Sequence, residues 1–234
     1  MTIPEIQRRL RKLANKEKAR ILQGFFKTGP GQYGEGDVFL GITVPVLRKM
    51  AKEWRETTVA DSLTLLRSEL HEQRMLALFL LLQTYQQGDE AVRKKIYGAY
   101  LKNTRHINNW DLVDLSASHI VGDYLSDKNR TPLYALARSR DLWEKRIAII
   151  ATLRFIRDDE YADTLAIAAL LVRDDRDLIH KAVGWMLREV GKRDVATLER
   201  FLQEHYRVMP RTMLRYAIER FPEAKRQRYL KGKV

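Results

Sequence analysis

Apolar residues recur at helical spacing along almost the whole chain of 234 residues. Leu63, Leu66 and Leu70 are one example, and residues three or four positions apart share one face of a helix. No stretch shows the sustained alternation of apolar and polar residues, bounded by hairpin turns, that is typical of strands. The pattern therefore predicts an all-α fold.

One stretch is rich in residues that break helices. The chain has only six prolines and twelve glycines, and they are densest in KTGPGQYGEGDVFLGITVP, residues 27–45. We predict one long loop here, between an opening helix and the remaining helices. GPGQYG, residues 29–34, has the glycine spacing of a dinucleotide-binding motif, but no strand precedes it and no βαβ unit surrounds it. We therefore interpret it as part of a turn-rich loop.

A basic residue followed by small and apolar residues opens successive predicted helices. These basic residues are Arg74, Arg146, Lys181 and Arg215, with separations of 72, 35 and 34 residues. Because 72 is twice 36, a further helix is expected near position 110, where NNWDLVDLSASHIVGDYL puts Trp110 in the slot of the basic residue. A period near 35 residues, without the tetratricopeptide or ankyrin consensus, predicts a curved α-solenoid of HEAT-like helical repeats.

The charge of the chain indicates a polyanionic partner. Lys and Arg number 43 against 30 Asp and Glu, so the net charge is +13, and the pI is about 9.9. Nucleic acid is the first candidate and an anionic membrane surface the second. If the second helix of each repeat lines a concave face, the recurring basic residues form a stripe suited to phosphates. Alternatively, each is a solvated residue at a helix start without a partner.

The segment NNWDLVDLSA, residues 108–117, places two aspartates beside a tryptophan. With Asn108 or Asn109 as N-cap, Asp111 falls in the first helical turn, where the helix dipole alone favours a carboxylate. Asp114 lies one turn after Trp110 among apolar neighbours, and a carboxylate there needs a partner. One interpretation is a structural ion pair with Arg146 of the next repeat, and the other is a functional role.

A second tryptophan supports the functional interpretation. Trp185 lies four residues after Lys181 on a predicted inner helix, whereas Trp54 and Trp143 resemble packing residues at helix starts. Tryptophans are most often core residues, but two of them on inner helices of a basic concave face, one flanking an aspartate, would make an aromatic and anionic spot that favours a cation by cation–π contact. A purine alkylated on a ring nitrogen is such a cation in DNA.

Other residue types indicate whether a metal or cofactor is expected and in which compartment the protein is expected. There is no cysteine, and the five histidines lack metal-ligand spacing, so we expect no metal and no cofactor. The N-terminal sequence has no apolar signal core, and the longest apolar run, residues 75–82, is shorter than the roughly 20 residues of a membrane span. We expect a cytoplasmic protein that associates with the nucleoid when bound to DNA.

The separated motifs together resemble one family. The chain contains, in order, GQYGEGDVFLGITVP, HEQRMLALFLLL, NNWDLVDLSA, LWEKRIAI and HKAVGWMLRE. They resemble AlkD-type DNA alkylation repair proteins, the HEAT-like-repeat alkylpurine DNA glycosylases. The resemblance covers nearly the whole chain, which we expect to form one domain, residues 1–234. It implies a monofunctional glycosylase that hydrolyses the N-glycosidic bond of cationic N3- and N7-alkylated purines in base excision repair.

The resemblance also implies roles for individual residues. Trp110 and Trp185 would flank the lesion nucleotide, Asp114 would be the catalytic carboxylate, and Arg146 would be a cation near the DNA backbone. We expect a monomer that binds double-stranded DNA containing alkylated purines. The residues to which we assign DNA contacts are Arg74, Lys181, Arg188 and Arg215.

The implied chemistry needs only one carboxylate. A cationic alkylpurine leaves without a general acid, and a carboxylate aimed at the sugar stabilises the positive charge that develops there. The main alternative is a non-catalytic HEAT-like solenoid that binds nucleic acid or a protein partner through its basic groove. Asp114 favours catalysis, because a pure phosphate binder gains nothing from a carboxylate within its basic face.

Overall fold

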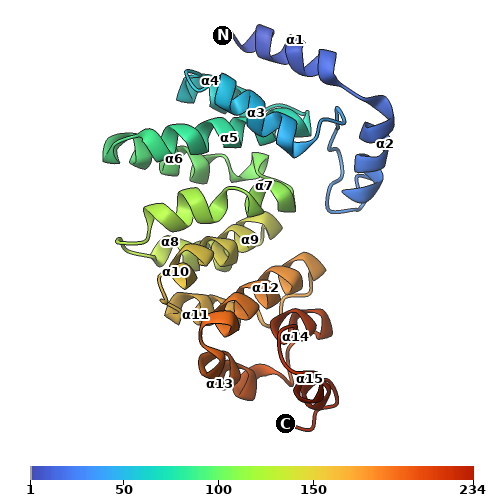
Figure 1. Ribbon diagram of the computed structural model, residues 1–234, viewed down its shortest axis with the longest axis vertical. Coiled ribbons are helices and arrows are strands. Elements are labelled where there is room, and N and C mark those ends of the chain that lie inside the picture. The colour runs from blue at the N-terminus through green and yellow to red at the C-terminus, as the bar shows by residue number, and fades with distance from the viewer. Residues whose placement is uncertain (1) are drawn as a thin grey trace. The chain divides into compact units, whose positions relative to one another are not determined.

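A computed structural model describes residues 2–234, and its regular elements are helices (Figure 1). Within these residues no strand is present, and the one β feature is an isolated bridge between Val38 and Leu70. No helix of this part of the chain is long and apolar enough to cross a membrane. The predicted all-α fold is confirmed. The chain divides into two compact units between Leu112 and Val113.

Unit 1, which ends at Leu112, is built around one long apolar helix. α5 is buried along most of its length, because its MLALFLLL segment is apolar on all sides. α3, α4 and α6 pack against it. The elements of this unit are α1 (Ile3–Leu13), α2 (Lys16–Phe25), α3 (Val44–Glu53), α4 (Val59–Leu66), α5 (His71–Gln87), α6 (Glu90–Lys102), η1 (Thr104–His106) and the start of α7 (Trp110–Asp114).

The N-terminal segment differs from the single opening helix that the sequence predicts. It forms two helices, α1 and α2, because Asn15 begins a new helix by accepting a hydrogen bond from the backbone N–H of Lys18 at 2.9 Å. The predicted long loop is present as residues 26–43, between α2 and α3.

Unit 2, which starts at Val113, is built around α12. This helix packs against α9, α11, α13 and α14, and a Cβ atom at Gly184 would lie 2.5 Å from the carbonyl oxygen of Met213. Glycine therefore allows α12 and α14 to approach closely. The elements are η2 (Ser118–Gly122), α8 (Thr131–Ala137), α9 (Leu142–Ala151), α10 (Leu153–Arg157), α11 (Ala162–Leu171), α12 (Asp177–Arg193), α13 (Val195–His205), α14 (Arg211–Ala217) and α15 (Glu223–Leu230).

The helical repeats are present, with a register that differs from the prediction. Their second helices are α5, α7, α9, α12 and α14, and they begin near the predicted interval. The recurring basic residues do not open these helices but lie at the fourth or fifth position, because each helix starts three or four residues earlier. In α9 this earlier start is capped by the side chain of Asp141. Trp110 is the first residue of α7. Asp114, rather than Trp110, therefore occupies the slot that a basic residue takes in the other repeats.

The helix predicted from residue 108 onward is interrupted. α7 ends at Asp114, and the chain continues into η2, a wider π-helical turn. η2 packs closely on the helix pair that follows, since a Cβ atom at Gly122 would lie 2.2 Å from the carbonyl oxygen of Ala151. The broken helix leaves Asp114 at the end of a short element instead of inside a long one.

Candidate functional site

The first turn of α7 is anchored by a buried asparagine. The side-chain Oδ1 of Asn109 accepts from the backbone N–H of Trp110 at 2.8 Å, and its Nδ2 donates to Asp37 Oδ2 at 2.9 Å. Of the two predicted capping residues, Asn109 therefore satisfies the helix start. Asp37, which belongs to the 26–43 loop, holds this capping residue in place.

Trp110 lies at the end of a stack of aromatic rings. Its indole stacks on Phe26 with a centroid distance of 5.2 Å and an interplanar angle of 22°. Phe26 stacks in turn on Phe39, at 5.0 Å and 17°, and Phe25 meets Trp110 edge-on at 6.0 Å. Such stacked and edge-on pairs stabilise ring orientation beyond simple burial. The half-buried Trp110 is thus oriented by aromatic side chains from α2 and the loop.

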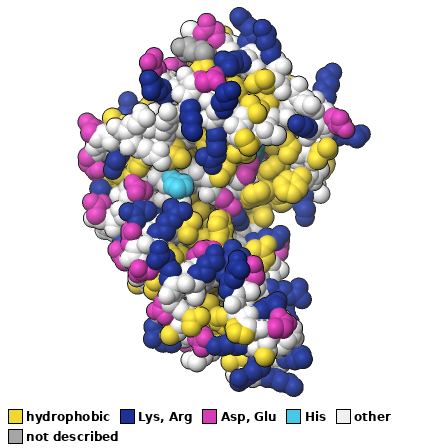
Figure 2. Space-filling model, in the orientation of Figure 1, with side chains coloured by type: hydrophobic (Ala, Val, Ile, Leu, Met, Phe, Trp, Pro, Cys, Tyr) yellow, Lys and Arg dark blue, Asp and Glu magenta, His cyan; other side chains and the backbone are white. Residues whose placement is uncertain are grey.

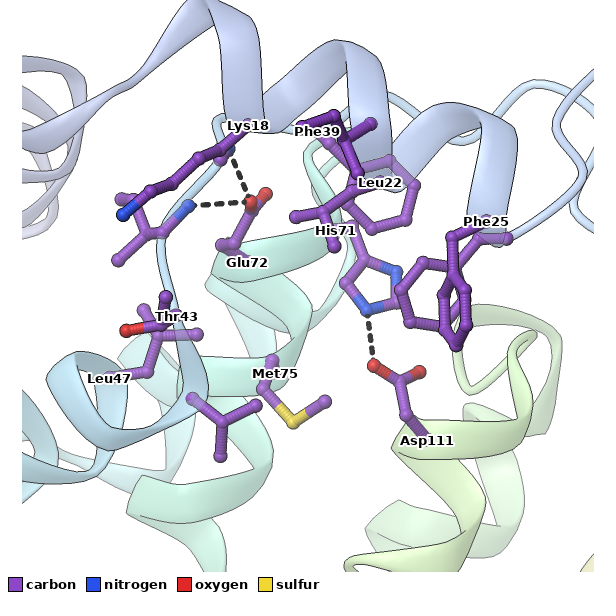
Figure 3. Close-up of a pocket in the computed structure, with 15 residues that line it drawn as sticks. Lys18, Leu22, Phe25, Phe39, Thr43, Leu47, His71, Glu72, Met75 and Asp111 are labelled. Atoms are coloured by element: carbon purple, nitrogen blue, oxygen red, sulfur yellow. Dashed lines mark hydrogen bonds and ion pairs between the residues drawn. The ribbon is translucent and has the colours of Figure 1, made fainter.

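An apolar cavity of about 330 Å³ lies in unit 1 beside this stack. Figure 3 shows Phe25, Phe39 and Met75 around it, with His71 and Asp111 joined at one side. Its surroundings are apolar as well: Figure 2 shows hydrophobic side chains gathered around α2, where Phe25 is 62% exposed. Unit 1 therefore presents an aromatic and apolar surface next to Trp110.

A group of buried charged side chains joins the loop, α5 and α7. His71 Nδ1 lies 3.1 Å from Asp37 Oδ2, and His71 Nε2 lies 2.9 Å from Asp111 Oδ2. Arg74 donates to the other oxygen of Asp37 and to the backbone carbonyls of Ser68 and Glu69. We call Asp37, His71, Arg74, Asn109 and Asp111 the anchoring network.

The charges of the anchoring network compensate one another. Burial alone would lower the pKa of His71, but its hydrogen bonds to Asp111 and Asp37 outweigh this and raise the pKa to about 9. Burial would raise the pKa of Asp37, yet the hydrogen bond from His71 and the charge of Arg74 keep that pKa below its usual value. Within the network, the pKa values of His71 and Asp37 therefore favour a protonated ring beside an ionised carboxylate at neutral pH.

A further buried carboxylate, that of Glu72, fixes the glycine-rich loop. Glu72 accepts hydrogen bonds from the backbone N–H groups of Leu40, Gly41 and Ile42 at 2.9, 2.7 and 3.1 Å, two of which are drawn in Figure 3. Gly41 has φ +80°, and a Cβ atom there would lie 2.2 Å from the carbonyl oxygen of Asn15. The loop is thus held in one conformation, which delivers Asp37 and Phe39 to α7.

In unit 2, Asp114 is held by Arg146. Arg146 Nε donates to Asp114 Oδ1 and Nη2 donates to Oδ2, both at 2.8 Å. Arg146 Nη1 also donates to the backbone carbonyl of Leu178, and its side chain is 5% exposed whereas that of Asp114 is 15% exposed. The ion pair considered from the sequence is therefore present. A contact of Arg146 with the DNA backbone stays a prediction.

Trp185 is oriented by a different acid. Its Nε1 donates to Glu189 Oε1 at 3.0 Å, and Lys192 Nζ lies 2.7 Å from the same oxygen. Trp185 also lines a cavity of about 370 Å³ together with Arg157 and Arg193. The indole thus lies beside several cations, which is compatible with an anionic ligand such as a phosphate.

The predicted DNA-binding residues have unequal exposure. Arg215 is exposed, Lys181 is 41% exposed and pairs with Asp177 of the same helix, and Arg188 is less exposed and bonds Glu219. Arg74 is 3% exposed, and Asp37 and two backbone carbonyls occupy its guanidinium. In this conformation Arg74 offers no surface to a phosphate, so we assign it to the anchoring network.

The sequence pattern does not indicate several residues of the site. The anchoring pairs of His71 join residues 34 and 40 positions apart, which no helical spacing indicates. One signal was available: the polar run HEQR directly before MLALFLLL, whose four residues are all buried. Trp54 and Trp143 are buried as predicted, although Trp54 follows the end of α3 rather than starting a helix.

Residues 2–234 contain no cluster of His, Cys, Asp and Glu placed to bind a metal.

Comparisons with known proteins identify similar chains. A family model described as "DNA alkylation repair enzyme" matches residues 6–221. A solved structure described as a predicted DNA alkylation repair enzyme from Enterococcus faecalis has a similar fold, with a TM-score of 0.70 and 18% identity over 90% of this chain and 97% of that chain. At this identity the structural likeness concerns the fold alone. No curated protein matches the sequence.

Proposed function

Because the chain belongs to the DNA alkylation repair enzyme family, and so has a role in the repair of alkylated DNA, we propose that it is a monofunctional DNA glycosylase. Its substrates are N3- and N7-alkylated purines in duplex DNA, and its reaction is hydrolysis of the N-glycosidic bond. The observation that carries this proposal is a partly exposed carboxylate, Asp114, held by both oxygens in a chain with a net charge of +13.

The reaction uses the positive charge of the lesion. An alkylated purine departs as a neutral base with the electrons of the bond between C1′ and the ring nitrogen, so no acid has to protonate it. Positive charge then develops on the deoxyribose, and a carboxylate placed beside it lowers the barrier. Water adds to C1′ and releases its proton, which leaves an abasic site. In this reaction Asp114 stabilises the sugar cation and orients the water.

Arg146 prepares Asp114 for this step. A carboxylate held by two parallel N–H groups has one orientation, and it does not need to reorganise as the sugar becomes charged. Each carboxylate oxygen accepts one bond from Arg146, so both oxygens are fixed by the same guanidinium group. Arg146 is therefore a positioning residue for Asp114 in this mechanism.

The two tryptophans hold the lesion nucleotide. Trp110 presents an aromatic face supported by Phe26, and Trp185 has its ring N–H tied to Glu189. An electron-rich aromatic face favours a cationic purine over a neutral one by cation–π contact. Lys181, Arg188 and Arg215 contact the DNA phosphates and give affinity without sequence preference.

The test is an excision assay with three substrates. Duplex DNA with one N7-methylguanine, one uracil or one 8-oxoguanine is incubated with the protein, and abasic sites are counted by alkaline strand cleavage against a control without protein. We expect cleavage at N7-methylguanine alone, because neutral bases need a proton that this site does not supply. No excision of N7-methylguanine or N3-methyladenine, together with retained DNA binding, would instead indicate a non-catalytic DNA-binding solenoid.

A further inference from the structure

We propose that His71 is a positioning residue for the reaction, acting as a charged bridge between Asp37 and Asp111 that fixes the first turn of α7 and with it Trp110. The inference rests on the proposed function, since it adds a residue that serves that reaction without touching the substrate. It also gives the glycine-rich loop a role, which is to deliver Asp37 to this bridge.

Protons on both ring nitrogens would satisfy both contacts of the ring with ionised carboxylates. Each nitrogen of His71 faces a carboxylate oxygen, at 3.1 Å for Asp37 and 2.9 Å for Asp111. A neutral imidazole has a single N–H, so one of these carboxylates would then face a nitrogen lone pair. The ring is 3% exposed, and no water is needed to complete its hydrogen bonds. The arrangement is thus built for the imidazolium form.

The surroundings of the ring reinforce this charge state. Asp37 from the loop and Asp111 from α7 face its two nitrogens, while Arg74 of α5 binds the other oxygen of Asp37. Phe39 stacks on the imidazole at 4.4 Å and shields it.

Two other charged residues lie near the ring of His71. The carboxylate of Glu72, next to His71 in α5, is turned to the backbone N–H groups of the loop. Lys18 of α2 lines the apolar cavity that borders His71. The proton of His71 therefore depends mainly on Asp37 and Asp111.

Two connections through hydrogen bonds link His71 to Trp110. Asp37 accepts from Asn109, whose side chain accepts in turn from the backbone N–H of Trp110. On the other side of Trp110, Asp111 is the direct partner of His71. Loss of the His71 proton would set a lone pair against a carboxylate and release the start of α7. Trp110 would then lose its fixed position against the aromatic stack.

Two measurements on the full-length protein test this inference. The tryptophans are labelled as 5-fluorotryptophan, the resonance of Trp110 is assigned with Trp110→Phe, and its ¹⁹F shift is followed from pH 6.5 to 10. Single-turnover excision of N7-methylguanine and the affinity for undamaged duplex are measured over the same range. His71→Gln is compared with the matched variant His205→Gln, a histidine that packs on Phe201 in unit 2.

We expect the Trp110 resonance to titrate with a midpoint near the His71 pKa of about 9, and excision to fall through the same midpoint while DNA affinity changes little. His71→Gln should shift the Trp110 resonance at pH 7.5, remove the titration and slow excision by about 10- to 100-fold. His205→Gln should match the wild type.

The outcomes separate this inference from the proposed function. Full excision by a folded His71→Gln protein, or a Trp110 resonance that does not respond to it, overturns the positioning role. Failure of the wild-type protein to excise any alkylpurine overturns the proposed function. In that case the Trp110 resonance alone decides whether His71 fixes this residue, and an unchanged resonance rejects the bridge as well.

Discussion

Asp114 and Arg146, 32 positions apart in the sequence, form a two-pronged ion pair in which Nε and Nη2 of the arginine each donate to one carboxylate oxygen at 2.8 Å. Both residues occupy the fifth position of their helices, α7 and α9. The repeat that carries an acid in this slot is thereby paired with the next repeat, which carries a base. The orientation of the proposed catalytic carboxylate follows from this match.

Replacement of Arg146 should affect catalysis more than binding. Arg146→Lys keeps the positive charge but loses the fork, so Asp114 gains rotational freedom. We expect single-turnover excision to slow by about 10- to 100-fold, with DNA affinity within a factor of about three and a stability loss on the order of 1 to 2 kcal/mol. Quench-flow kinetics and urea denaturation measure the two effects.

Arg154→Lys is the matched control for Arg146→Lys. Arg154 also pairs with two acids of unit 2, Asp123 and Asp158, but it is 30% exposed. It should lose little stability and retain the wild-type excision rate. Equal losses of activity in both variants would show that the Asp114 fork has no special role.

Stability should decline at alkaline pH because of His71. Its pKa is raised in the folded protein to about 9, above the usual 6.5. The folded state therefore binds the proton more tightly, and the stabilisation is complete below pH 6.5 and lost as the pH rises through about 9. The free energy of unfolding should fall by on the order of 3 kcal/mol between pH 6.5 and 10. Urea denaturation at five pH values tests this, and His71→Gln should flatten the curve.

Asp111→Asn should lower the stability of the folded protein by more than the helix-dipole argument indicates. From the sequence, Asp111 needs only the favourable field of the first turn, whereas the structure makes it a partner of the buried His71. Removal of its charge should destabilise the protein by about 1 to 3 kcal/mol and shift the alkaline loss of stability to lower pH. An unchanged pH profile of unfolding in Asp111→Asn would contradict the anchoring network.

Salt should weaken binding to undamaged duplex. If Lys181 and Arg215 each neutralise one phosphate, then alanine at either position should reduce the slope of log K against log salt by about 0.9. Arg9→Ala removes one exposed charge from unit 1, where Arg9 pairs with Glu53, and should leave the slope unchanged. Fluorescence anisotropy between 50 and 300 mM salt is a suitable measurement. A slope near zero for the wild type would exclude phosphate neutralisation.

The repeats and the Asp114–Arg146 pair could be predicted because both follow from periodicity. A period near 35 residues aligns positions of successive helices, so an acid and a base one repeat apart become candidate partners. The register was wrong by one helical turn, since each helix starts three or four residues before its basic residue, as α9 does after the capping residue Asp141. That error put Trp110 in a slot that Asp114 occupies.

The anchoring network could not be predicted because its members come from a loop and two helices without a common period. Asp37 looks like an ordinary turn residue in a glycine-rich segment, and only the folded loop brings it to His71 and Asn109. The burial of Arg74 has the same origin, since its partner Asp37 lies 37 positions away. A tertiary contact from an irregular loop leaves no pattern in the sequence.

The central claim is that the charge of Asp114 drives excision, and Asp114→Asn tests it most directly. This change keeps the side-chain shape but removes the negative charge. On duplex DNA with a single N7-methylguanine, single-turnover excision should fall by at least about 100-fold, while the affinity for the same duplex holds or rises. Thermal denaturation identifies the folded fraction for which both values are reported. Excision by Asp114→Asn at the wild-type rate would contradict the account.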